Sequence, residues 1–138
     1  MDITGKWRLR SVLRFNEDFE KRWVDVEEAM NDETLDDSDK RMLQSVIDIT
    51  PEGMIIMMMP LPENVSQDQI DEAVASGEIT LCDNGMFIYE KHPWKEENGC
   101  FYFNSGIKGE ILGEEIDPWE KLIIEDDSLT MLVYRFVR

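Results

Sequence analysis

Residues 5–15 read GKWRLRSVLRF, and this stretch decides the fold class. Apolar or small side chains occupy the odd positions from Trp7 to Phe15, while Lys or Arg occupies most of the even positions. Alternation with a period of two is typical of a strand whose two faces meet different surroundings. The segment therefore predicts a half-buried strand that turns Trp7, Leu9 and Leu13 toward a core and a basic face toward solvent.

Composition limits the possible partners. A chain of 138 residues with 42 % hydrophobic residues predicts one packed domain, residues 1–138. The formal net charge is −17, and residues 16–40 and 110–127 hold 11 and 8 of the acidic side chains. Such a surface repels phosphate, which argues against nucleic acid and anionic lipid as partners. No apolar run is long enough for a membrane span and no leader precedes Gly5, so we expect a cytoplasmic protein.

Two amphipathic patterns follow the first strand. The first predicts a helix over 17–31, with its apolar residues on one stripe: Phe19, Trp23, Val26 and Met30. The second begins with possible N-caps at 36–38 and ends before Pro51, and its apolar residues are Met42, Leu43, Val46 and Ile47. We therefore expect a pair of helices inserted between the first and second strands.

Residues 53–59 read GMIIMMM and predict a second strand that is apolar on both faces. A strand without a polar face needs cover on both sides, either from a helix or from a second copy of the chain. A homodimer through the outer face of residues 54–59 is thus one expectation. A short third helix is predicted next, because Ser66 and Gln69 form a capping box and Gly77 has the place of a C-terminal cap.

From Glu78 onward, short apolar segments alternate with turn signals such as DNG, ENG and NSG. The predicted strands lie at 79–82, 86–91, 100–104, 107–112, 121–125 and 129–137. With the first two strands, this pattern predicts a mainly β fold, an antiparallel up-and-down barrel of about 8–10 strands that closes on itself.

The Gly5-x-Trp7 opening, the meander and the closing LTMLVYRFVR together resemble the calycin superfamily, which includes lipocalins and intracellular fatty-acid-binding proteins. The resemblance implies that Trp7 plugs one end of the barrel and that Arg138 or Arg135 packs over its ring. It also implies that the helix pair forms a lid over the opening. The last strand departs from the fatty-acid-binding pattern, since Leu132 stands where that pattern has the Arg that clamps a carboxylate.

Alternation along the strands predicts which side chains line the barrel interior. The predicted wall is Leu9, Leu13, Met57, Met59, Phe87, Phe101, Phe103, Leu132 and Tyr134. This wall allows two functions. The protein could be a carrier or sensor that holds a small apolar molecule inside the barrel. Alternatively, side chains could fill the barrel, and the chain could be an acidic module for protein–protein interaction.

Catalytic and metal sites are not predicted. His92 is the only histidine, it is expected in a turn before Pro93, and no nucleophile motif accompanies it. The spacing of Cys82 and Cys100 fits neither a zinc site nor a redox motif, so both are expected to be thiols. We therefore expect no enzyme activity, no cofactor and no metal.

Overall fold

The computed structural model describes residues 2–15, 18–82 and 85–138. Three short helices accompany the strands: α1 (Val26–Ala29), α2 (Asp37–Met42) and α3 (Gln67–Ala75). The strands are β1 (Gly5–Phe15), β2 (Lys21–Asp25), β3 (Val46–Ile49), β4 (Met54–Pro60), β5 (Thr80–Leu81), β6 (Met86–Glu97), β7 (Cys100–Asn104), β8 (Glu110–Ile111), β9 (Glu114–Glu115), β10 (Trp119–Lys121), β11 (Ile123–Glu125), β12 (Ser128–Met131) and β13 (Tyr134–Val137).

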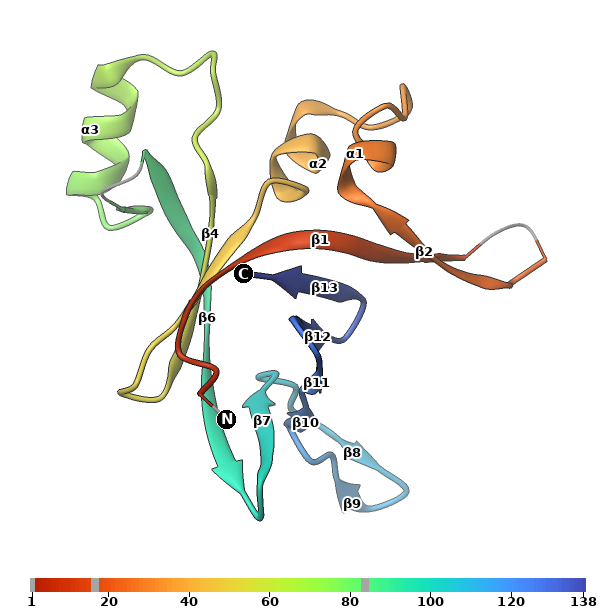
Figure 1. Ribbon diagram of the computed structural model, residues 1–138. Helices are drawn as coiled ribbons and strands as arrows, with labels where there is room; N and C mark the ends of the chain where they lie inside the picture. The colour runs from red at the N-terminus through yellow and green to blue at the C-terminus, as the bar shows by residue number, and fades with distance from the viewer. Residues whose placement is uncertain (1, 16–17, 83–84) are drawn as a thin grey trace.

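The main sheet curves into a nearly closed antiparallel barrel (Figure 1). Its strands follow the chain round the barrel in the order β1, β3, β4, β6, β7, β10, then β11, β12 and β13, and β13 pairs with β1. Between β10 and β11 lies only Leu122, whose backbone N–H donates to the carbonyl of Phe101 at 2.8 Å. The prediction of an antiparallel up-and-down barrel is therefore confirmed.

The two ends of the chain meet at Trp7. The indole is 4 % exposed, and its Nε1 donates to the carbonyl of Ile3 at 2.9 Å. The guanidinium of Arg138 lies 4.2 Å from the centre of the Trp7 ring and donates to the carbonyls of Thr4 (3.0 Å) and Asp2 (2.8 Å). The contact that the resemblance implied is thus made by Arg138.

Gly5 is needed at this junction for two reasons. Its φ of +110° is a conformation that residues with a side chain rarely adopt. A Cβ at this position would also lie 3.2 Å from Nη1 of Arg138, so a larger residue would push on the guanidinium. Arg135, the other candidate for the Trp7 contact, lies elsewhere: its guanidinium is 4.1 Å from the centre of the Trp23 ring.

The alternation predicted for the first strand holds only as far as Leu9. A β-bulge follows, because Leu9 pairs with Phe136 and the next paired residue is Ser11, opposite Arg135. The extra residue changes which side chains face inward. Ser11 and Val12 are both buried, Leu13 is half-buried, and Phe15 is 57 % exposed.

The helix predicted over 17–31 is wrong for most of its length, and its first residue lies outside the described part of the chain. Residues 21–25 form β2, which pairs with the outer half of β1 in a ribbon that extends beyond the barrel (Figure 1). Only Val26–Ala29 is helical. The reason is a long-range contact: Trp23 pairs with Leu13, and its ring lies against the Arg135 guanidinium. Phe19, the first residue of the predicted stripe, is 84 % exposed.

The second predicted helix ends early. It stops at Met42, and Val46–Ile49 forms β3 between β1 and β4. Three of the four residues of β3 are β-branched, and such side chains favour strands over helices. The third helix is confirmed, with both hydrogen bonds of the Ser66–Gln69 capping box and with Gly77 at φ +80°.

β4 is covered on both faces within a single chain. Ile55, Met57 and Met58 are buried, and the other four residues of the strand are half-buried. The expected cover is therefore present, and this strand has no exposed apolar face that would require a second copy.

The C-terminal strands differ from the prediction in three places. Residues 107–112 lie mostly outside the barrel, where Glu110–Ile111 pairs with Glu114–Glu115 in a separate two-stranded arm. Residues 121–125 are interrupted at Leu122. The single strand predicted over 129–137 is a hairpin, in which Met131 pairs with Tyr134 and Leu132 has φ +57°.

Replacing Arg138 with Ala should lower the free energy of unfolding by about 2 kcal/mol, because the variant loses a cation–π contact and two hydrogen bonds. Arg135→Ala is the control, since Arg135 of β13 also stacks on an indole, but that indole is Trp23 on the ribbon. Its loss should be at most about 1 kcal/mol. Urea unfolding followed by tryptophan fluorescence measures both values, and equal losses would contradict a special role for the Trp7 junction.

Candidate functional site

Most of the barrel interior is a packed hydrophobic core. Four residues of the predicted ligand wall, Leu9, Met57, Phe101 and Phe103, are buried in it and are between 1 and 7 % exposed. They belong to one cluster with apolar side chains from the other barrel strands, among them Ile47, Ile49, Ile55, Leu129 and Phe136. In the structure these four residues therefore contact protein side chains, with Leu9 also reaching a pocket at the edge of the core.

That pocket, which we call the α2 pocket, has a volume of about 150 Å³. It is lined by Leu9, Val12, Leu13 and Arg14 of β1, by Asp39, Met42 and Leu43 of α2 and the residue after it, and by Val133 and Tyr134. Three residues of the predicted wall, Leu9, Leu13 and Tyr134, thus meet here. The helix α2 forms one side of the pocket, and the turn between β12 and β13 forms another.

Hydrogen bonds hold α2 at both of its ends. At the start, the Asp36 side chain accepts from the backbone N–H of Asp39 at 2.8 Å. At the end, Ser45 links the helix to the barrel: its carbonyl accepts from the N–H of Leu9 at 3.0 Å, and its Oγ lies 3.2 Å from the Tyr89 hydroxyl. No residue of α2 itself is buried, so its position depends on these links and on Leu43, which directly follows the helix and is buried in the core.

Tyr89 is the residue near this pocket with a clearly shifted pKa. Burial of its phenol raises the pKa to about 12, because the phenolate would lose hydration. The contact with Ser45 acts in the opposite direction but is smaller. Tyr89 is therefore neutral in the physiological pH range and joins β6 to the end of α2 by a hydrogen bond.

The remaining wall residues lie apart from the α2 pocket. Leu132 is 56 % exposed at the tip of the β12–β13 turn, so its prediction as a wall residue is wrong. The reason is the tight turn at Leu132 and Val133, which interrupts the strand predicted over 129–137 and with it the alternation of inward and outward side chains. Phe87 lies outside the core cluster and lines another pocket under α3, while Met59 is its paired neighbour on β4.

The pocket under α3, which we call the α3 pocket, was not predicted from the sequence. Its volume is about 220 Å³. Its lining is Leu61, Pro62, Val65, Gln69, Ile70, Ala73, Glu78, Ile79 and Phe87. The predicted third helix was the one signal for it, because two apolar residues of that helix, Ile70 and Ala73, line this pocket.

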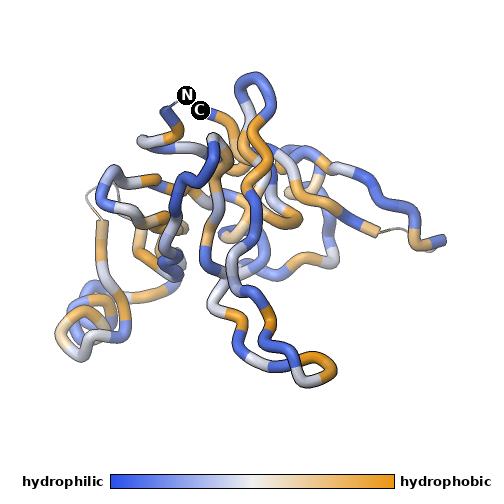
Figure 2. The backbone as a smooth tube through the Cα atoms, turned by 90° about the horizontal axis from the view of Figure 1, so that it is seen from below, coloured by the Kyte–Doolittle hydropathy of each residue, from blue (hydrophilic) through white to orange (hydrophobic). Residues whose placement is uncertain are grey.

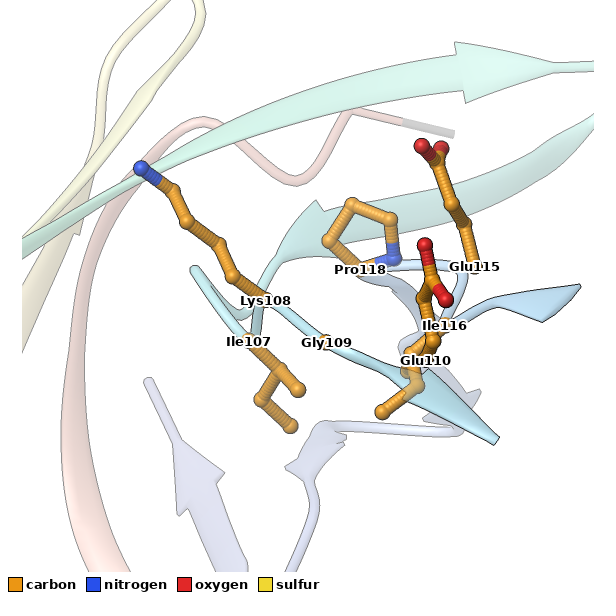
Figure 3. A pocket seen from close by; sticks show the side chains of 7 residues that line it. All are labelled: Ile107, Lys108, Gly109, Glu110, Glu115, Ile116 and Pro118. Carbon is orange, nitrogen blue, oxygen red and sulfur yellow. The ribbon is translucent and has the colours of Figure 1, made fainter. Parts of the chain in front are cut away.

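A third pocket, of about 420 Å³, lies at the base of the arm formed by residues 110–115 (Figure 3). Figure 3 shows Glu115 and Glu110 on the two strands of the arm with Ile116 between them, Pro118 and Ile107 on the near side of the groove, and the Lys108 side chain pointing away. Glu110 and Glu115 are paired across the arm. This pocket is a surface groove with two neighbouring carboxylates.

His92 lies within β6 and not in the predicted turn. Its Nδ1 is 2.9 Å from the carbonyl of Asn104, its Nε2 is 2.8 Å from a carboxylate oxygen of Glu90, and its ring packs edge-on against Phe103. Both ring nitrogens are therefore engaged. The arrangement joins β6 to the end of β7 and offers no nucleophile next to a base.

In the described ranges, no group of three or more His, Cys, Asp or Glu side chains is placed to hold a metal ion. Among the helices of the same residues, none has the length and apolar character that crossing a membrane requires. Cys82 and Cys100 are thiols and do not form a disulfide with each other.

Tyr89→Phe should remove the tyrosinate step of highest pH, near 12, from a spectrophotometric titration of the folded protein. Tyr102→Phe is the control and should leave that step in place. The pKa is raised above the value of about 10 expected in the unfolded chain, so the stabilisation is complete below pH 10 and is lost as the pH rises from 10 toward 12. Wild-type stability that stays constant across this interval would contradict the burial of Tyr89.

Comparison with protein-family models, with curated proteins and with solved structures finds no match to this chain.

Proposed function

We propose that this protein is a calycin-like binding protein for a small apolar molecule, and that the ligand occupies the α2 pocket. The observation that carries the proposal is the meeting of Leu9, Leu13 and Tyr134 from three predicted wall positions in one pocket beside α2. Trp7 lies about 20 Å from Leu13 along β1, at about 3.3 Å per residue. In the proposed calycin-like arrangement, the buried Trp7 lies toward one end of β1 and the ligand pocket lies toward the other end.

The size of the α2 pocket limits the ligand. A pocket of about 150 Å³ accepts a molecule of about the size of benzene, whereas drug-sized ligands need about 300 Å³ or more. A larger ligand would require α2 to move outward, and the buried side chain of Leu43 at the end of the helix would resist this movement. Because Leu132 replaces the clamping Arg and lies in a turn, we propose a neutral ligand without a free carboxylate.

The expected cytoplasmic location remains part of this proposal. Both cysteines are thiols, which fits a reducing compartment. A homodimer is not part of it, because β4 is already covered within one chain.

An acidic module for protein–protein interaction is the second candidate. The packed barrel core favours it, and so does the arm of residues 110–115, whose hydrophobic tip stands clear of the barrel in Figure 2. Leu112 is fully exposed there and Ile111 is 64 % exposed. Directly opposed Glu110 and Glu115 repel each other, and a basic partner would relieve this repulsion.

The proposal predicts saturable binding of benzene, a neutral apolar molecule that matches the volume of the α2 pocket. Val133→Trp should weaken this binding at least tenfold, because the indole would occupy the rim of the α2 pocket. Leu132→Trp is the matched control, since it adds the same side chain to the neighbouring, outward-facing position of the same turn, and it should leave binding unchanged. Titration with benzene, followed by the methyl NMR signals of Leu9 and Leu13, measures binding by all three proteins.

Two results would contradict the α2 pocket as the binding site. The first is the absence of saturable binding to the wild-type protein, which would favour the interaction module. The second is an equal effect of the two Trp variants, which would mean that the probe binds elsewhere.

A further inference from the structure

The helix α3 stands apart from the barrel beside the ends of β4 and β6, and two perpendicular views agree on this (Figures 1 and 2). It has nine residues, none of them buried. An isolated helix of fewer than about 12 residues is marginal in water, so α3 needs contacts beyond its own hydrogen bonds. Its capping box supplies one such contribution, and the α3 pocket supplies the apolar contacts.

The chain holds α3 over this pocket from both sides. On one side, residues 61–65 lead from β4 into the helix and contribute three apolar side chains to the lining. On the other, the backbone N–H groups of Glu78 and Ile79 donate to the carbonyl of Ala73 at 2.9 and 3.3 Å. The chain then enters β5, which pairs with Phe87 and Ile88 of β6. Only four residues therefore separate the end of α3 from β5, the strand that pairs beside Phe87 of the pocket lining.

The lining selects for an apolar ligand. Seven of its nine residues are apolar, and the aromatic ring among them belongs to Phe87. Its volume of about 220 Å³ exceeds the roughly 150 Å³ that suffices for benzene, so it has room for a bicyclic molecule. Ile70, Ala73 and Phe87 are each only half-buried. A ligand would remove their remaining apolar surface from water, which is favourable.

The charge around the pocket excludes anions. The exposed acids of α3 are Asp68, Asp71 and Glu72, and Glu78 stands at the rim. An anionic ligand would be repelled by these carboxylates, and the lining itself contains no basic side chain. The chemistry of the pocket therefore fits a neutral molecule.

We propose that the α3 pocket is a second binding site, which takes a neutral mono- or bicyclic apolar molecule and over which α3 closes as a lid. This site is separate from the proposed α2 pocket and shares no lining residue with it. A bound ligand would bury Ile70 and Ala73, the apolar side chains of α3 that are partly exposed in its absence. Binding and ordering of the helix would then be coupled.

Indole is a suitable probe, because it is neutral, bicyclic and small. In methyl-resolved NMR of the wild-type protein, titration with indole should shift the methyl signals of Val65, Ile70, Ala73 and Ile79 in a saturable way. Hydrogen exchange of the α3 amides that exchange by local opening should slow about tenfold when indole is present at ten times its dissociation constant. Unshifted α3-pocket methyls at saturating indole would overturn the proposal.

Ala73→Phe and Ala75→Phe form a matched pair on the same helix. Ala73 lines the pocket, whereas Ala75 is exposed and outside the lining. Phe at position 73 should fill the pocket and weaken indole binding at least tenfold, and Phe at position 75 should leave it unchanged. Equal binding by the two variants would overturn the assignment. Circular dichroism of both variants reports whether the helix is retained, and the wild-type methyl shifts test the site without any substitution.

Val133→Trp separates this proposal from that of the α2 pocket. It should abolish probe binding there while the indole-induced shifts at α3 persist. Loss of the α3 shifts in Val133→Trp would overturn the independence of the second site, and methyl shifts confined to Leu9 and Leu13 in the wild-type protein would overturn the site itself.

Discussion

The structure depends on the contact between the Trp7 indole and the Arg138 guanidinium. The two residues are far apart in the sequence, so their contact closes a loop that includes nearly the whole chain. Pairing of β1 with β13 fixes the position of every strand between them, because each strand follows its predecessor round the barrel. Gly5 allows the close approach, which gives the GxW opening a structural reason that does not depend on a ligand.

The sequence predicted features that depend on local chemistry. The first strand, the capping box of α3 and the antiparallel order of the barrel all have signals within a short window. The helix predicted over 17–31 is wrong because residues 21–25 pair with strand partners outside that segment, which a local pattern does not show. Trp23 is held by Leu13 across the ribbon and by Arg135 from the other end of the chain.

The candidate sites were harder to predict for a related reason. Alternation shows which side chains face inward, but not whether they meet a ligand or one another. Phe101 and Phe103 meet other core residues, so space for a ligand is left at the periphery, beside α2 and α3. The β12–β13 turn has no Gly, Asn or Asp to mark it, and Leu132 adopts a positive φ that its residue type does not favour.

The single-residue break at Leu122 has a consequence for how the protein would aggregate. β10 and β11 form the two ends of the sheet path and are not paired with each other. The chain passes from one to the other through the buried Leu122, whose backbone N–H donates to Phe101 of β7. On heating, this seam is the place where the sheet can separate with the fewest broken ladder bonds. The opened form would present two unpaired strand edges to other molecules. Residues 110–127, with 8 acids, flank that seam. Their mutual repulsion would keep opened molecules apart at low ionic strength, and high salt or acid would remove this protection.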